Sequence, residues 1–163
     1  MIYKRLALCI FSILVLAFPL GGCGAPKEEP ANTVEPPETE EAVSSDAELT
    51  LSIDGVTVEV AWEDNEAIEE LKALAADQPY EIKMSKYSDF EQVGPIGKIL
   101  TSNDVQMTTQ PGDIVLYSGD QMVIFYGKNS WAYTKLGHIT DKSEEELKDL
   151  LAKDNVTVSV SIV

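Results

Sequence analysis

Apolar and polar residues alternate along two neighbouring stretches, residues 49–53 and 56–62. This period of two is typical of strands that bury one face. Between them, Asp54-Gly55 favours a tight type I′ turn, in which both residues take positive φ. The pattern therefore predicts a β-hairpin over residues 49–62.

The apolar positions change to helical spacing twice. After a polar capping stretch, the first stripe predicts a short amphipathic helix over about residues 64–76. Farther along, Ser143 and Glu146 have the spacing of a capping box at the start of a second helix. The two apolar stripes are Ile68, Leu71, Leu74 and Ala75, then Leu147, Leu150 and Leu151.

Short apolar runs elsewhere predict the remaining strands, at 80–84, 113–117, 121–126 and 156–162. The two central runs are almost continuously apolar, so we expect both of their faces to be buried, as in a barrel wall covered by a helix. Residues 94–97 are predicted as a loop, because Pro95 cannot donate to a strand ladder. The resulting fold class is mainly β: a closed antiparallel barrel capped at its ends by two short α-helices.

The N-terminal run is apolar without alternation. Lys4 and Arg5 precede an apolar stretch that ends at Leu20, and Gly21-Gly22-Cys23 follows. This order is typical of a bacterial lipoprotein signal, so residues 1–22 are expected to be removed and Cys23 to carry acyl chains, palmitate among them. The alternative is an ordinary secretory signal in which the cysteine is incidental.

Residues 23–48 have a different composition, rich in proline and glutamate and poor in large apolar side chains. Such a stretch cannot bury enough surface to fold, so we expect a disordered acidic tether between the lipidated cysteine and the domain. It acts as a spacer in one interpretation and as an unselected leader in the other. Residues 49–163 then form one domain with one core.

The charge of the chain limits the classes of partner it can bind, and its cysteine content limits the chemistry of the folded domain. The chain has 12 basic and 28 acidic residues, and loss of Lys4 and Arg5 leaves 10 against 28, a balance of −18. Phosphates repel such a surface, so no nucleic acid is expected as a partner. Cys9 leaves with the signal, so the mature chain keeps Cys23 alone and has no disulfide, redox pair or thiolate zinc site.

Three segments carry a resemblance to a known family. Residues 110–117, 123–127 and 129–137, in this order of elements, resemble the bacterial cyclophilin-like domain family over residues 49–163. The resemblance implies the cyclophilin barrel. Prolyl isomerisation in true cyclophilins uses an arginine, whose planar guanidinium lysine replaces poorly. Arg5 is the only arginine here and lies in the predicted signal, so no catalytic residue is transferred.

Aromatic residues around one predicted hairpin are the candidates for a binding cleft. Tyr126, Trp131 and Tyr133 would form its floor and rim, with His138 as a titratable neighbour. Under the alternative interpretation the aromatic residues are barrel core. His138 as a general base would need a nucleophile and an orienting group, for which Ser130 and Asp141 are candidates by type alone, so a structural histidine is favoured.

No motif indicates a cofactor, and no calcium loop or other metal site is expected. Three functions stay open: a ligand-, peptide- or protein-binding module, a prolyl isomerase or folding helper with a non-standard site, and a structural surface protein. The first is favoured because of the aromatic residues. We expect a monomer on the extracytoplasmic face of the cell membrane, held there through the lipid on Cys23.

Overall fold

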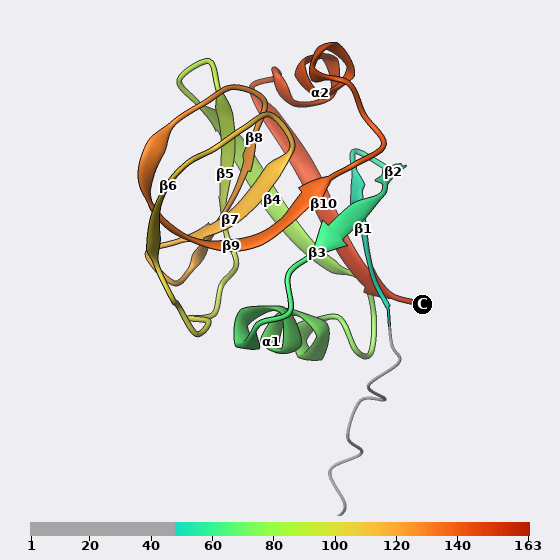
Figure 1. The fold of residues 1–163 in the computed structure, drawn as a ribbon. Coiled ribbons are helices and arrows are strands. Elements are labelled where there is room, and N and C mark those ends of the chain that lie inside the picture. The colour runs from blue at the N-terminus through green and yellow to red at the C-terminus, as the bar shows by residue number, and fades with distance from the viewer. Residues whose placement is uncertain (1–47) are drawn as a thin grey trace, which may run out of the picture. The chain divides into compact units, whose positions relative to one another are not determined.

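The computed structural model describes residues 48–163. The predicted signal 1–22, the lipidation site Cys23 and the tether as far as residue 47 lie outside the described residues. Within the described part, antiparallel strands form a nearly closed barrel with two short helices (Figure 1). This confirms the predicted fold class. The strands are β1 (Leu49–Ile53), β2 (Val56–Val58), β3 (Val60–Trp62), β4 (Tyr80–Tyr87), β5 (Glu91–Pro95), β6 (Val105–Thr108), β7 (Asp113–Tyr117), β8 (Gln121–Phe125), β9 (Ser130–Ile139) and β10 (Asn155–Ile162).

The barrel closes because the two ends of its strand order are neighbours in the chain. The order is β2-β1-β10-β4-β5-β8-β7-β9-β3, and β6 pairs with the start of β9 outside this path. Only Glu59 separates β2 from β3 along the chain. The outer strands of the sheet are therefore brought together by a covalent connection.

The first hairpin is confirmed for its first half only. Asp54 and Gly55 have φ of 48° and 80°, as a type I′ turn requires, and β2 pairs with β1. The predicted strand 56–62 is divided at Glu59, however, and its second part pairs with β9. The alternation runs through both parts, so the pattern did not show that the strand changes partner.

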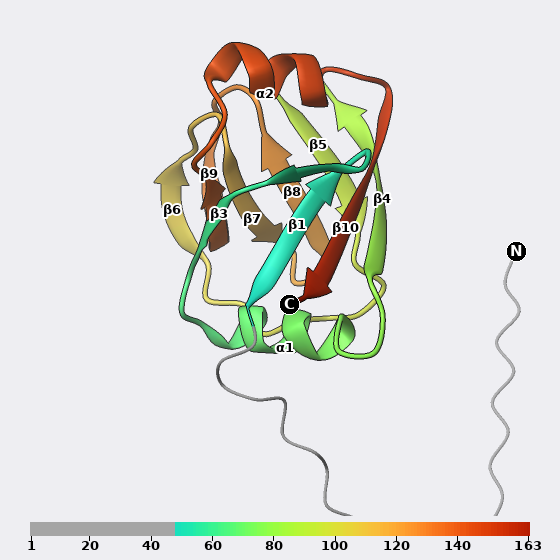
Figure 2. The ribbon, with the colours of Figure 1, turned by 90° about the vertical axis from the view of Figure 1, so that its right-hand side faces the viewer.

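The two helices lie at opposite ends of the barrel, where Figure 2 shows α1 (Glu66–Leu74) below and α2 (Glu144–Leu151) above the strands. Asn65 caps α1, its side-chain oxygen accepting a hydrogen bond from the Ile68 backbone N–H. Ser143 and Glu146 form the predicted capping box of α2. Neither helix of the described residues has the length and apolar character that a membrane crossing needs.

Both faces of β7 and β8 are buried, as predicted, but in two separate clusters. The barrel interior takes Ile114 and Ile124 with most of the apolar side chains of the strands and both helices. The outer face carries a smaller cluster around Phe125 and Tyr133, against which Met107 packs. The expectation that a helix covers this wall was wrong, because β6 and the start of β9 cover it.

β4 and the predicted loop 94–97 differ most from the sequence prediction, whereas α1, β8 and β10 differ from their predicted bounds by one or two residues at an end. β4 continues to Tyr87, three residues beyond the predicted strand. The predicted loop 94–97 is wrong at its start, because Gly94 and Pro95 end β5 in register with β8. Proline is tolerated there because β4 pairs with β5 only as far as Val93, so position 95 has no strand on that side.

Candidate functional site

A cavity of about 470 Å³ lies on the outer face of β5, β8 and β7, beneath the start of β9. Its lining comes from strands that are far apart in the sequence. Nine residues line it: Tyr87, Glu91, Val93, Tyr117, Gln121, Val123, Asn129, Trp131 and Tyr133.

Strand register explains the floor of the cavity. Val93 of β5 is directly opposite Val123 of β8, which in turn faces Val115 of β7. One row away, Glu91 lies between Tyr87 of β4 and Phe125 of β8. Residues opposite one another point to the same face of a sheet, so these rows build an apolar floor with one carboxyl group at its edge.

The start of β9 forms the wall. Residues 130–133 leave the barrel to pair with β6, and they carry Trp131 and Tyr133. The Tyr133 ring lies edge-on to Tyr117 and Phe125, with centroid distances of 6.0 and 5.7 Å. Its hydroxyl oxygen accepts a hydrogen bond of 2.9 Å from the Asn129 side-chain amide. The Tyr133 part of the wall is therefore held in place before any ligand binds.

The rim of the cavity is aromatic and open to solvent. Tyr87, Tyr117 and Trp131 are 63%, 40% and 57% exposed, and no other aromatic residue in 48–163 is exposed to this degree. Isolated exposed apolar residues are ordinary, but several around one hollow mark a binding surface. All three of these rings line the same cavity.

Glu91 is the electrostatic feature of the cavity. The residue is only 6% exposed, and its Oε2 atom is buried without a hydrogen-bond partner among residues 48–163. Burial raises the pKa of its carboxyl group to about 7. Burial also raises the pKa of Tyr126 and Tyr133, and the charge of Glu91 adds to both shifts. An acid that titrates near neutrality therefore lies in an aromatic cavity.

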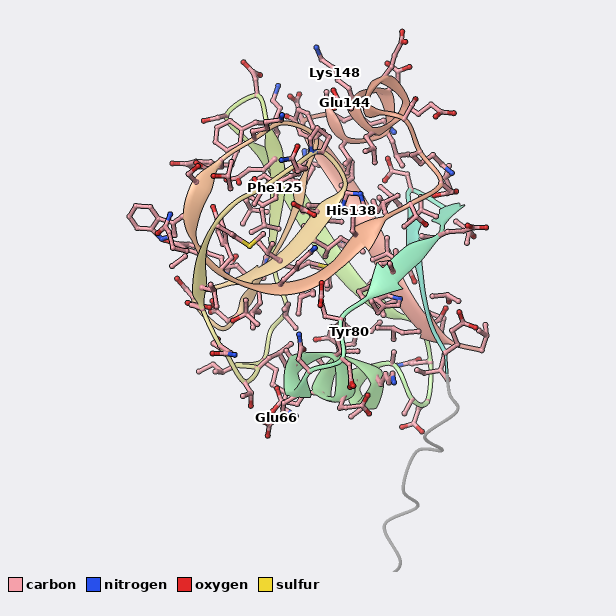
Figure 3. The ribbon with its side chains drawn as sticks, in the orientation of Figure 1. Glu66, Tyr80, Phe125, His138, Glu144 and Lys148 are labelled. Atoms are coloured by element: carbon pink, nitrogen blue, oxygen red, sulfur yellow. The ribbon has the colours of Figure 1, made fainter. Side chains whose placement is uncertain are left out.

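The structure brings together two of the four residues predicted to form a cleft. Trp131 and Tyr133 both line the cavity, as their alternation on one strand suggested. Tyr126 packs into the barrel core, where its hydroxyl has no partner among the described residues. His138 lies on the barrel strand β9 (Figure 3) and is not among the residues that line the cavity.

His138 has a structural partner. Its Nδ1 atom is 2.8 Å from Oδ1 of Asp113, which is buried at the start of β7. The other oxygen of Asp113 accepts a hydrogen bond from the Gln110 backbone N–H at 2.8 Å. Register places the pair together, because Asp113 is opposite His138. The carboxylate therefore fixes both the loop before β7 and the imidazole ring.

Glu91, Tyr87 and Gln121 were not predicted as site residues. The sequence holds one signal for Glu91: it alternates with Val93, which places both on one face of a strand. The signal is weak, because the neighbouring Gln92 is also polar and is fully buried on the opposite face, so polarity does not distinguish the two faces of the strand. The Gln92 amide donates there to the backbone carbonyls of Leu151 and Lys153.

A second cavity, of about 520 Å³, lies between the start of α1 and the strands β6 and β9. Its walls carry Glu63, Glu66 and Lys135, and the Lys135 ammonium is 3.4 Å from the Glu63 carboxylate. These charges are already paired or face solvent. Among residues 48–163, no group of three or more His, Cys, Asp or Glu residues could hold a metal ion.

Two solved structures are similar to part of this chain at low sequence identity. No curated protein matches the chain. The solution structure of the hypothetical protein AF2241 from Archaeoglobus fulgidus is 21% identical, with a TM-score of 0.47, over 69% of this chain and 92% of that one. McbB in complex with tryptophan is 12% identical, also with a TM-score of 0.47, over 70% of this chain and 44% of that one.

The family model gives the assignment. The model of the Cyclophilin-like family matches residues 51–162, which include every strand and both helices apart from the first two residues of β1. The chain belongs to the Cyclophilin-like family.

Proposed function

We propose that this protein is a lipid-anchored binding protein of the cell envelope, whose cyclophilin-like barrel holds a small molecule or a peptide side chain in the aromatic cavity. The observation that carries the proposal is that all three exposed aromatic residues of the described chain surround one cavity of about 470 Å³. Small-ligand sites typically measure 300–1,000 Å³ and combine apolar walls with a few polar groups.

The cavity is suited to binding because its walls are preorganised. The Tyr133 ring is held by two aromatic contacts and by Asn129, and the Asn129 backbone N–H donates to the Thr109 hydroxyl at 2.9 Å. A wall that is already ordered loses little side-chain freedom when a ligand binds. The exposed Trp131 ring supplies apolar area that a ligand can cover.

Binding is favoured over catalysis by the groups that line the cavity. They include one carboxyl group, Glu91, and no serine, cysteine, histidine or lysine. The alternative function, prolyl isomerisation, needs a planar charged donor near the imide. Arg5 is the only arginine of the chain and precedes the predicted cleavage after Gly22.

The anchor is supported by the sequence alone. The lipobox Leu20-Gly21-Gly22-Cys23 ends the apolar run, and an acyl chain contributes about 0.8 kcal/mol for each methylene group it buries in a bilayer. We expect Cys23→Ala to move the protein from the membrane fraction to the soluble fraction. Unchanged membrane fractionation of this variant would contradict the anchor without touching the binding proposal.

The binding proposal is tested by screening small amines, alcohols, amides and short peptides against ¹⁵N-labelled protein. Two tryptophan side chains in the chain give two indole N–H signals. Trp131 lines the cavity, whereas Trp62 is part-buried and donates to the Leu49 carbonyl at 2.7 Å. Ligands should shift the Trp131 signal and leave the Trp62 signal in place. A screen that shifts neither signal would overturn the proposal.

Trp131→Ala is the matched variant, because it separates binding from folding. The side chain is more than half exposed, so we expect the variant to fold and to lose binding. Global unfolding of Trp131→Ala would assign the ring to the core and remove the proposed rim.

A further inference from the structure

The cavity contains a buried acceptor that nothing in the described chain satisfies. Oε2 of Glu91 is buried without a hydrogen-bond partner, and no ion pair of residues 48–163 involves this side chain. Buried polar atoms are nearly always paired, so an exception needs an explanation. A partner can be supplied by a group that enters the cavity from outside.

Register fixes the carboxyl group on the cavity side of the sheet. Glu91 is opposite Phe125 of β8 and Tyr87 of β4, and Phe125 packs in the outer cluster rather than in the barrel interior. The turn between β4 and β5 supports this position, because the Phe90 carbonyl accepts hydrogen bonds from the Tyr126 and Gly127 backbone N–H groups. The acid is therefore built into the sheet.

The Glu91 carboxyl group and the aromatic rings of the cavity favour a positively charged ligand. The cavity lining contains no basic residue, so an anion would meet an acid and no compensating cation. The faces of tyrosine and tryptophan rings attract cations, and a carboxylate accepts hydrogen bonds from ammonium N–H groups. The excess of 28 acidic over 12 basic residues in the chain adds a field of the same sign.

We propose that the cavity takes a primary ammonium group at the end of an unbranched apolar stem, with the Glu91 carboxylate accepting its N–H hydrogen bonds and the rings of Tyr87, Tyr117 and Trp131 covering the stem. This inference rests on the proposed binding function and gives its ligand a chemical class. A primary ammonium fits better than a quaternary one, because only the former can donate to Glu91. Val93 and Val123 supply the apolar floor that the stem needs.

The test compares a cation with its neutral counterpart. The Trp131 indole signal is followed at pH 8, above the pKa of Glu91, during titration with n-pentylammonium chloride and, separately, with 1-pentanol. We expect the ammonium to bind at least tenfold more tightly than the alcohol. Nα-acetyl-lysine N-methylamide is titrated as a third probe. Tighter binding of this probe than of n-pentylammonium would indicate that the ammonium group of the ligand belongs to a lysine side chain of a peptide.

Glu91→Gln supplies the decisive variant. It keeps the shape of the side chain and removes the charge, so we expect ammonium binding to weaken at least tenfold and pentanol binding to stay within twofold. Glu81→Gln on the exposed side of β4 is the control for net charge, and it should bind like the native protein.

The two proposals fail in different ways. Equal binding of the alcohol and the ammonium, or ammonium binding unchanged in Glu91→Gln, would overturn the ammonium inference and leave the binding function standing. A Trp131 signal that moves with none of the three probes would overturn the inference. The broader screen then decides the binding function on its own.

Discussion

Replacing Glu91 by glutamine should stabilise the folded protein at pH 8 and leave its stability near pH 4.5 almost unchanged. Burial raises the pKa of this carboxyl group from 4.5 to about 7. The folded state therefore holds the proton more tightly than the unfolded state does. The native protein bears no penalty below about pH 4.5, and the penalty grows as the pH rises and is complete above about pH 7.

The magnitude follows from the size of the rise. At about 1.4 kcal/mol for each pKa unit, the rise from 4.5 to about 7 corresponds to at most ~3.5 kcal/mol. The cavity is open to water, which screens the charge, and the glutamine amide brings its own donors into the same place. We therefore expect Glu91→Gln to gain on the order of 1–2 kcal/mol of unfolding free energy at pH 8.

The assay is urea unfolding of the whole chain at pH 4.5, 6, 7 and 8, followed by far-ultraviolet circular dichroism. Other groups change the unfolding free energy with pH in the opposite direction. The pKa of Asp54 is lowered by hydrogen bonds from the Thr157 backbone N–H and from Lys153, so its contribution to stability is lost as the pH falls. These contributions are the same in the native protein and in Glu91→Gln, so they cancel in the difference between the two unfolding free energies.

Glu81→Gln removes the same charge from an exposed position on β4. A gain for Glu91→Gln that is the same at pH 4.5 and pH 8 would refute the reasoning. An equal gain for Glu81→Gln would refute it as well, because the effect would then come from net charge alone.

Three further outcomes are expected. Gly94→Ala should lose about 1–3 kcal/mol of stability in urea unfolding, because an added Cβ would lie 2.6 Å from the Lys83 carbonyl oxygen; an unchanged midpoint would contradict this contact. Asn65→Ala should lose about 1–2 kcal/mol of unfolding free energy, since the Asn65 side chain caps α1 and donates to the Lys135 carbonyl at 2.8 Å. Asn65→Asp keeps the capping oxygen, so it should recover the share of this loss that is due to the cap. The whole chain should not accelerate isomerisation of a proline peptide in a protease-coupled assay, and an acceleration that a point substitution abolishes would support the isomerase alternative.

Local patterns were sufficient for most of the elements. The helix stripes, the capping box at Ser143 and the turn at Asp54-Gly55 depend on neighbouring residues, so they can be recognised in the sequence. The division of the strand at Glu59 depends on which strand each half pairs with, and alternation carries no such information. The strand β6 was missed because it has only four residues and most of its side chains are exposed, although Val105 and Met107 alternate with polar residues.

The candidate site was harder to predict, because its residues come from different strands and meet only through the register in which those strands pair. Trp131 and Tyr133 share one strand, so their alternation placed them on one face. Glu91 joins them through its position opposite Phe125, which no local pattern shows. Tyr126 follows Phe125 directly and therefore points to the opposite face, into the core.

The most direct test of the binding cavity is to locate a bound probe by nuclear Overhauser effects. With n-pentylammonium on the native protein at pH 8, cross-peaks are expected between the methylene protons of the probe and both the Val93 and Val123 methyl groups and the Trp131 ring. These three residues line the cavity from β5, β8 and β9. Cross-peaks to side chains of α1 or α2 in place of these would place the ligand elsewhere and contradict the assignment of the cavity as the binding site.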